Sequence, residues 1–284
     1  MTILITTPNG TVGRHVTAAL RDRDDVRFFV RSEASMEALG DVRGEVVRGD
    51  ATDAADVRRA VAGVDRLFLA HPFAEDQIVA ETTLGATALE AGTRRIVKLG
   101  ARAFGDGIVH DPVTAAHDVI TARLLAVGVP ELSVLRPDRF LQNFLSSAQA
   151  IASGTLADPA GPGSRGYVDA RDIAEVAVAE LLSDNPIGGD IELSGPQLMT
   201  LQEIADSFAT VLGRPVRHID IPLDDAWRAR LLARGVEPWI VDGLRGLYTN
   251  YRLEGTAALG DGVQRVLGRS PRSVEAFAAD LLRP

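Results

Sequence analysis

Three polar side chains in this sequence could donate or accept a proton during a reaction. His71 follows one apolar run, Lys98 lies within another, and His117 lies in a segment with helical spacing. An imidazole titrates near neutral pH and an ammonium can donate a proton, so these residues are candidate catalytic groups. Each has a structural alternative: His71 as a polar loop residue, Lys98 as the partner of a surface carboxylate, and His117 as a structural or solvated helix residue.

Residue usage excludes several kinds of chemistry. Lys98 is the only lysine among 30 basic residues, and the chain has no cysteine. Cysteine nucleophiles, disulfides and thiolate metal sites are therefore ruled out. The Tyr-x-x-x-Lys acid–base pair, in which a lysine lowers the pKa of a phenol, is also absent, because Arg94 lies four residues before Lys98. No Ser-His-Asp set and no spacing of metal ligands is visible, so we expect no metal.

A turn that contains glycine, close to the N-terminus, predicts a nucleotide site. An apolar strand over 2–6 is followed by Thr-Pro-Asn-Gly-Thr-Val-Gly and by a helix that begins near Val12. Gly10 and Gly13 lie where the backbone must approach a pyrophosphate and where the helix must pack closely on the strand. Thr7 replaces the first glycine of the usual pattern. A threonine is tolerated there if its φ is negative; alternatively, its presence indicates that the pyrophosphate site has decayed, or the segment is a plain strand-to-helix turn. The predicted cofactor contacts in this turn are Thr7, Asn9, Gly10, Thr11, Val12 and Gly13.

Residues that follow later strands extend the predicted cofactor site. Arg31 follows strand 26–30, where an acidic residue would favour NAD; a guanidinium suits the 2′-phosphate of NADP(H), unless it is a solvated loop arginine. Asp50 follows strand 45–48 and could accept a hydrogen bond from the adenine amine or close the turn before Asp53. The further predicted cofactor contacts are Ala51, His71, Pro72 and Lys98.

Alternating strands and helices must position these side chains. The alternation predicts an α/β fold, a Rossmann-like doubly wound parallel sheet with a smaller, mostly helical C-terminal lobe. We assign residues 1–150 to an NAD(P)-binding domain, with core strands also supplied from about 165–195, and residues 151–284 to the substrate-binding lobe. The predicted strands are 2–6, 26–30, 45–48, 66–70, 95–99, 132–135 and 218–221. The predicted helices begin near 12, 53 and 273, span 77–91, 113–127, 140–151, 172–182 and 200–213, and include two within 223–251; 154–166 is predicted as a loop or hairpin.

Composition limits the partners. A net charge of −9 argues against a nucleic-acid partner, which normally needs a basic face. No apolar run reaches the length of a membrane helix, so we expect no membrane partner and a cytoplasmic location.

Several of these motifs together resemble the NmrA-like family of atypical short-chain dehydrogenases/reductases, over nearly the whole chain. Residues 135–143, Leu-Arg-Pro-Asp-Arg-Phe-Leu-Gln-Asn, are very similar to the family's Leu-Arg-Pro-x-x-Phe-x-x-Asn. The opening turn resembles the family's Gly-Ala-Thr-Gly-x-x-Gly, and Arg31 falls on the arginine that members use for NADPH. The chain departs from the pattern at Thr7, at Gly100, where a serine is usual, and at Thr121, where a glutamate follows the helix histidine.

The resemblance implies an enzyme that binds NADP(H) and reduces a quinone or a related conjugated aromatic or carbonyl compound. Phe140 and Asn143 would then wall the substrate cleft, and a homodimer is left open. A quinone accepts hydride with little acid catalysis, so the missing Tyr/Lys pair is compatible with this activity. Two alternatives remain: a non-catalytic redox sensor that binds NADP, and a tailoring enzyme of secondary metabolism, an isomerase or cyclase, with a degenerate cofactor site.

Overall fold

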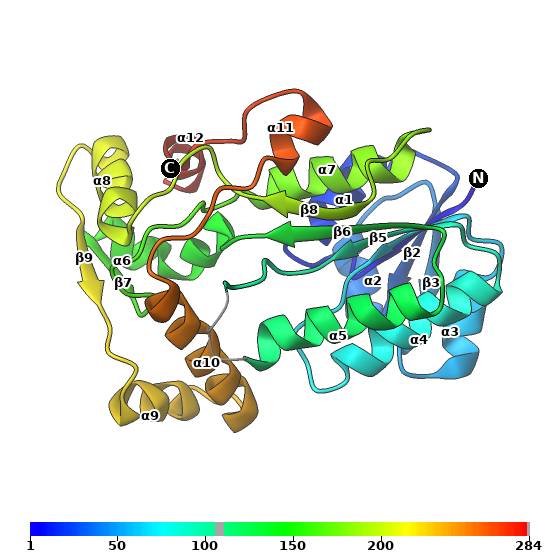
Figure 1. The fold of residues 1–284 in the computed structure, drawn as a ribbon, viewed down its shortest axis with the longest axis horizontal. Helices are drawn as coiled ribbons and strands as arrows, with labels where there is room; N and C mark the ends of the chain where they lie inside the picture. Colours follow the sequence, from blue (N-terminus) through cyan, green and yellow to red (C-terminus); the bar gives the residue numbers. More distant parts are fainter. Residues whose placement is uncertain (106–110, 283–284) are drawn as a thin grey trace.

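One large parallel sheet organises the fold. The computed structural model describes residues 1–105 and 111–282. Seven parallel strands lie in the order β3-β2-β1-β4-β5-β6-β8 (Figure 1). The order reverses between β1 and β4, which is the switch point where such sheets bind nucleotides. The predicted Rossmann-like doubly wound fold is confirmed. The strands are β1 (Ile3–Thr6), β2 (Val26–Val30), β3 (Glu45–Arg48), β4 (Arg66–Leu69), β5 (Arg95–Leu99), β6 (Glu131–Pro137) and β8 (Gly189–Leu193).

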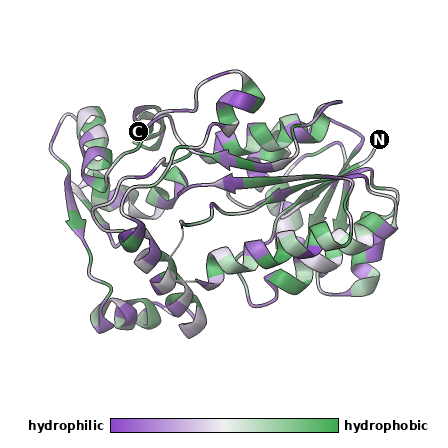
Figure 2. Cartoon of the chain, in the orientation of Figure 1, coloured by the Kyte–Doolittle hydropathy of each residue, from purple (hydrophilic) through white to green (hydrophobic). Residues whose placement is uncertain are grey.

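Successive residues of each strand enter two separate cores. Ile3 and Ile5 of β1 pack on the face that α1 and α7 cover, whereas Leu4 packs on the face of α3, α4 and α5, as the two-residue period of a strand requires. Figure 2 shows hydrophobic residues along the central strands and mixed hydropathy on the covering helices. These helices are α1 (Gly13–Leu20), α2 (Glu33–Leu39), α3 (Ala54–Val61), α4 (Gln77–Glu90), α5 (Pro112–Ala126) and α7 (Ala170–Leu182).

A second packed unit lies beyond the arrowheads of β6 and β8 (Figure 1). Its own core includes Phe144, Ile204 and Phe208. A small parallel sheet of β7 (Thr155–Asp158) and β9 (Arg217–Asp220) lies beside this core. The other elements after β6 are the 3-10 helix η1 (Leu141–Ser147) and helices α6 (Ala148–Ala152), α8 (Leu201–Leu212), α9 (Asp225–Ala233), α10 (Pro238–Glu254), α11 (Gly262–Leu267) and α12 (Val274–Leu281).

Two predictions for this unit are wrong. The single helix predicted over 140–151 is split at Ser147, whose φ of −105° and ψ of 4° separate η1 from α6. The segment 154–166 contains strand β7 and is not a hairpin, because Thr155 pairs in parallel with Arg217. A parallel pair needs a long crossover, which no local turn signal reveals. The sequence reading also missed α2 and α11.

Several helix ends follow the predicted capping chemistry. Asp53 accepts hydrogen bonds at the start of α3, and Thr200 forms a complete capping box with Glu203 at the start of α8. Gly213 ends α8 in the left-handed conformation with φ of 65°. In the part of the chain that the structure describes, no helix combines the length and the apolarity needed to cross a membrane.

Candidate functional site

The first cavity lies at the carboxyl ends of β1 to β4, and we call it the β1–β4 cavity. Its volume is about 270 Å³. Because parallel strands bring their carboxyl ends to one edge, residues that are far apart in sequence meet there. Its walls include seven of the predicted cofactor contacts, Thr7, Asn9, Arg31, Asp50, Ala51, His71 and Pro72.

The backbone at Thr7 is unusual. Its φ is +50°, and it is the one non-glycine residue with positive φ in the described ranges. The condition under which a threonine would fit here without strain is therefore not met, since a left-handed residue with a Cβ costs about 1–2 kcal/mol. The side chain offsets part of this cost, because Thr7 Oγ1 donates to the Ala70 carbonyl at 2.8 Å.

The two glycines of the turn pack against Thr7. A Cβ at Gly13 would lie 2.0 Å from the Thr7 carbonyl oxygen, and one at Gly10 would lie 3.0 Å from Thr7 Cγ2. Gly13 thus lets α1 approach β1, as predicted. Val12 is the buried N-cap of α1 and Thr11 is exposed beside it. Asn9 fastens the turn to the next element, since its Nδ2 donates to the Ser35 carbonyl at 2.6 Å.

Arg31 and Asp50 differ in the hydrogen bonds and ion pairs that their side chains form within the protein. Arg31 is exposed and forms no ion pair within residues 1–105 and 111–282. Asp50 Oδ1 accepts from both the amide and the hydroxyl of Thr52, at 2.8 and 2.7 Å. These bonds lower the pKa of Asp50, and nearby Arg31 lowers it further. Asp50 therefore shapes its turn, while the Arg31 guanidinium is available to a ligand.

The second cavity lies beside the first, and we call it the β5–β6 cavity. Its volume is about 340 Å³. His71 and Pro72 line the first cavity and Phe73 lines the second, so the loop after β4 borders both. The predicted residues His117, Phe140 and Asn143 also line it. Tyr251 lines it as well, and so do Arg102, Phe104 and Leu247, which were not predicted from the sequence.

Lys98 lies behind this second cavity, in a buried cluster with Glu81. Both side chains are fully buried, and Lys98 Nζ lies 2.6 Å from Glu81 Oε2. The ammonium also donates to the Leu99 carbonyl at 2.8 Å and lies 3.2 Å from His117 Nδ1. The alternative of a surface carboxylate partner is wrong, because α4 carries Glu81 inward. Lys98 is not among the described residues that line either cavity, so nothing here brings it to a ligand directly.

Charge and burial set the protonation of this cluster. Burial and, to a lesser extent, the adjacent Lys98 and Arg136 together lower the pKa of His117 to about 3. Burial also lowers the pKa of Lys98, although the Glu81 carboxylate acts in the opposite direction. The imidazole is therefore neutral near pH 7, and its Nδ1 accepts from Lys98. The remaining ring proton is then on Nε2.

Helix α10 forms the far wall of the β5–β6 cavity. It packs on the start of α5, where Asn250 Nδ2 donates to Asp111 Oδ2 at 2.7 Å. Gly243 lets it approach Phe73, since a Cβ there would lie 3.1 Å from that ring. Trp239 lies 5.0 Å from the same ring. The C-terminal unit and the loop after β4 thus enclose this cavity together.

Arg139 stiffens the same wall. It is buried, pairs with Asp158 at 2.9 Å, and lies over the rings of four aromatic residues. Arg165 lies 4.1 Å from the centre of the Tyr251 ring and donates to Glu254 at 2.8 Å. Burial raises the pKa of Tyr251, so its phenol stays protonated near neutral pH. The rings around Arg139 are Phe144, Tyr167, Tyr248 and Tyr251.

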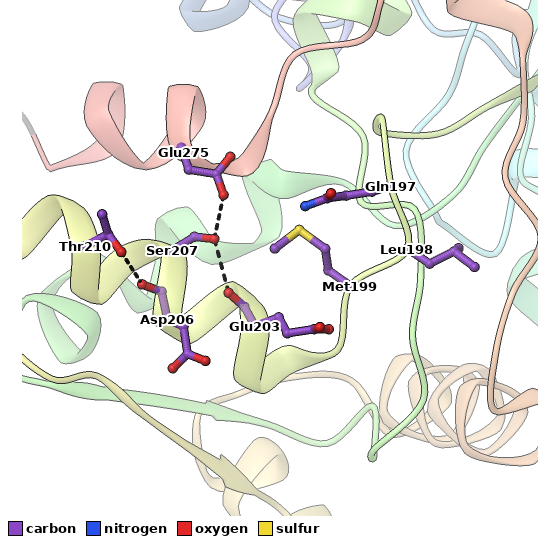
Figure 3. A pocket seen from close by; sticks show the side chains of 8 residues that line it. All are labelled: Gln197, Leu198, Met199, Glu203, Asp206, Ser207, Thr210 and Glu275. Atoms are coloured by element: carbon purple, nitrogen blue, oxygen red, sulfur yellow. Dashed lines mark hydrogen bonds between the residues drawn. The ribbon is translucent and has the colours of Figure 1, made fainter.

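A third hollow, of about 330 Å³, lies on the C-terminal unit and carries several acidic groups. Figure 3 shows Ser207 between Glu203 and Glu275, with hydrogen bonds to both. The Glu203 carboxylate already accepts from Thr200 in the capping box. Over the described ranges, no cluster of His, Asp and Glu is arranged to hold a metal ion. This hollow is a product of helix packing.

The sheet topology and the glycine turn at the switch point define a Rossmann-type α/β protein, and the second cavity is lined partly by its smaller C-terminal unit. The chain belongs to the NmrA-like family, whose pattern matches residues 1–258. The predicted resemblance is confirmed.

Relatives and solved structures agree with this assignment. The chain is 32% identical to a (4-alkanoyl-5-oxo-2,5-dihydrofuran-3-yl)methyl phosphate reductase of Streptomyces griseus, over 98% of this chain and 97% of that one. It is 29% identical to an NAD(P)H azoreductase of Xenophilus azovorans, over 97% and 96%. The fold matches the NADPH complex of an Escherichia coli quinone oxidoreductase, with a TM-score of 0.86, 20% identity and coverage of 99% and 100%. These names agree with the expectation of a reductase that uses a nicotinamide cofactor.

Proposed function

We propose that this protein is an NADPH-dependent reductase that transfers hydride to a quinone or a related conjugated carbonyl compound. The observation that carries the proposal is the pair of adjoining cavities at the carboxyl edge of the sheet, which share the loop 71–73. The two relatives named above support the reaction class, since one is named for an unsaturated lactone and the other for azo compounds.

The β1–β4 cavity suits the cofactor. Gly10 and Gly13 let the start of α1 pack closely against Thr7, and Thr7 lines the cavity. Amide groups at such a helix start suit a pyrophosphate. Arg31 is the cation that would hold the 2′-phosphate and so select NADPH over NADH. The bound cofactor would supply the hydride.

The β5–β6 cavity suits the substrate. Phe140 and Asn143 come from the segment after β6, and Leu247 and Tyr251 come from α10. We therefore assign substrate selection to the smaller lobe formed by residues 151–284, together with the segment that leads into it. Apolar and aromatic side chains in its walls suit a planar conjugated compound, and His117 Nε2 would donate a hydrogen bond to the oxygen of that compound.

Binding and turnover test the proposal separately. NADPH and NADH are titrated into the protein with tryptophan fluorescence or calorimetry, and a panel of quinones, azo dyes and unsaturated lactones is then tested for NADPH oxidation. We expect tighter binding of NADPH and turnover of at least one class. Binding without turnover across the panel would indicate a sensor, whereas turnover of a substrate without any cofactor would indicate a repurposed tailoring enzyme.

A further inference from the structure

The buried ion pair behind the β5–β6 cavity has no evident structural reason to be charged. Glu81 and Lys98 lie on different elements, α4 and β5, and both are fully buried. Apolar residues of similar size commonly replace such pairs with little loss of stability. Gln77 Nε2 donates to the second Glu81 oxygen at 3.0 Å, so the carboxylate is held from two sides.

Within residues 1–105 and 111–282, His117 is the hydrogen-bonded neighbour of this pair that also lines the cavity. Lys98 Nζ lies 3.2 Å from His117 Nδ1, and His117 lines the cavity. His117 Nε2 has no hydrogen-bond partner among the described residues. Because Nδ1 faces the ammonium, Nε2 is the ring nitrogen left for a ligand.

We propose that Glu81 and Lys98 are positioning residues that keep the proton of His117 on Nε2, and that Lys98 replaces this proton when His117 donates it to the substrate oxygen. The inference rests on the proposed function, because it needs a substrate that accepts hydride and proton.

Atoms and charge balance in the proposed step. The bound nicotinamide cofactor would supply the hydride to a substrate carbon and would itself be oxidised. The Nε2 proton of His117 moves to the substrate oxygen while one Nζ proton of Lys98 moves to Nδ1. The histidine stays neutral with its proton on Nδ1, and Lys98 becomes a neutral amine beside the Glu81 carboxylate. After product release, a solvent proton enters at Nε2 and the Nδ1 proton returns to Lys98.

The groups around His117 favour a neutral ring that receives one proton at Nδ1 as it loses another at Nε2. The other cation near the ring is Arg136 of β6, which pairs with Asp118 at 3.0 Å and with Asp190 at 2.7 Å. Burial and the two nearby cations lower the pKa of His117 to about 3, so the ring does not readily hold an extra proton. Burial lowers the pKa of Lys98, which makes its ammonium a better acid.

The first test reads the histidine tautomer and needs no activity. Nuclear magnetic resonance of the labelled ring nitrogens, with His117→Gln for assignment, should show the proton of His117 on Nε2 at neutral pH. The double variant Lys98→Met with Glu81→Leu removes both charges, and we expect it to stay folded because no unpaired charge is left buried. We expect it to populate both tautomers. The matched control for a buried glutamate is Glu180→Gln, whose partner is Ser133, and it should leave the tautomer unchanged. An unchanged tautomer in the double variant would overturn the positioning role.

The second test separates positioning from proton supply. Lys98→Arg keeps a donor to Nδ1 but cannot give up its proton. We expect Lys98→Arg to keep the Nε2 tautomer, and we expect it and the double variant to lower kcat on an unsaturated lactone about 100-fold, with smaller changes in KM and in NADPH affinity. Full kcat in the double variant would overturn the proton supply. If the wild type fails to oxidise NADPH with every compound of the panel, the proposed function is wrong. The tautomer measurement still decides the positioning role in that case.

Discussion

The turn after β1 and the cluster of Glu81, Lys98 and His117 both place polar groups at the carboxyl edge of the sheet, but they differ in what holds them. The turn is local: Thr7, Gly10 and Gly13 lie within seven residues and contact one another. The cluster joins α4, β5 and α5, and ion pairing and burial hold it together. This chain thus tolerates a left-handed threonine in the turn after β1 and maintains a buried charged pair beside the β5–β6 cavity.

The largest expected effect is on the free energy of unfolding, and it follows from removing one partner of the buried ion pair. Lys98→Met leaves the Glu81 carboxylate buried without its partner, so we expect a loss of about 3–5 kcal/mol in the free energy of unfolding. The double variant Lys98→Met with Glu81→Leu should recover most of this loss. Chemical denaturation measures both; a double variant as unstable as the single one would show that the pair itself stabilises the fold.

The next effect concerns the cofactor side. Arg31→Ala removes the cation that we assign to the 2′-phosphate, and a hydrogen bond to a charged group contributes about 1.5–3 kcal/mol. Titration should therefore show NADPH affinity about 10- to 100-fold weaker, with NADH affinity nearly unchanged. Arg43→Ala, at an exposed arginine paired with Asp24, is the control. Equal losses for both cofactors would remove the role assigned to Arg31.

Acid should reveal the neutral state of His117. Its pKa is lowered to about 3 in the folded protein, against about 6.5 in an unfolded chain. The contribution to stability is complete above about pH 6.5 and is lost as the pH falls, because only the unfolded chain takes up the proton, at about 1.4 kcal/mol per pH unit. His117→Gln should flatten this slope in denaturation curves measured between about pH 6.5 and 5. His71→Gln, at a loop histidine, serves as the control; an unchanged slope in His117→Gln would show that His117 is charged when folded.

The smallest expected effect lies at Thr7. Thr7→Gly relieves a left-handed threonine, a gain of about 1–2 kcal/mol. It also loses the hydrogen bond to Ala70, about 1 kcal/mol, and adds backbone freedom to the unfolded chain. The net change should stay within about 1 kcal/mol in thermal unfolding. Thr7→Ala keeps the strain and loses the bond, so it should be less stable than Thr7→Gly; the reverse order would mean that φ at this position is not costly.

Local signals explain why much of the fold could be predicted from the sequence. The strands 26–30, 45–48 and 95–99 have the predicted bounds, and Asp53 and Thr200 cap the predicted helices. Each of these features depends on neighbouring residues. Strand β7 could not be found in this way, because its pairing with β9 is set by residues about 60 positions away.

The same distinction applies to the candidate site. The β1–β4 cavity contains residues that follow strand ends, which periodicity locates. Glu81 could not be predicted as part of the site, because a single carboxylate within an apolar helix is usually a solvated residue. Tyr251 and Leu247 reach the β5–β6 cavity only through the docking of α10 on α5, which rests on contacts such as Asn250 with Asp111. Tertiary packing determines where these three side chains lie, and the local sequence pattern contains no information about that packing.

The most direct test of the central claim is a single-turnover measurement. Protein is mixed with NADPH or NADH and then with a quinone or an unsaturated lactone, and the absorbance of the reduced nicotinamide is followed. We expect a single-exponential oxidation of bound NADPH that is faster than that of NADH at equal concentrations. No binding and no oxidation of either cofactor, with any acceptor of the panel, would contradict it and would place this chain outside the reductases of its family.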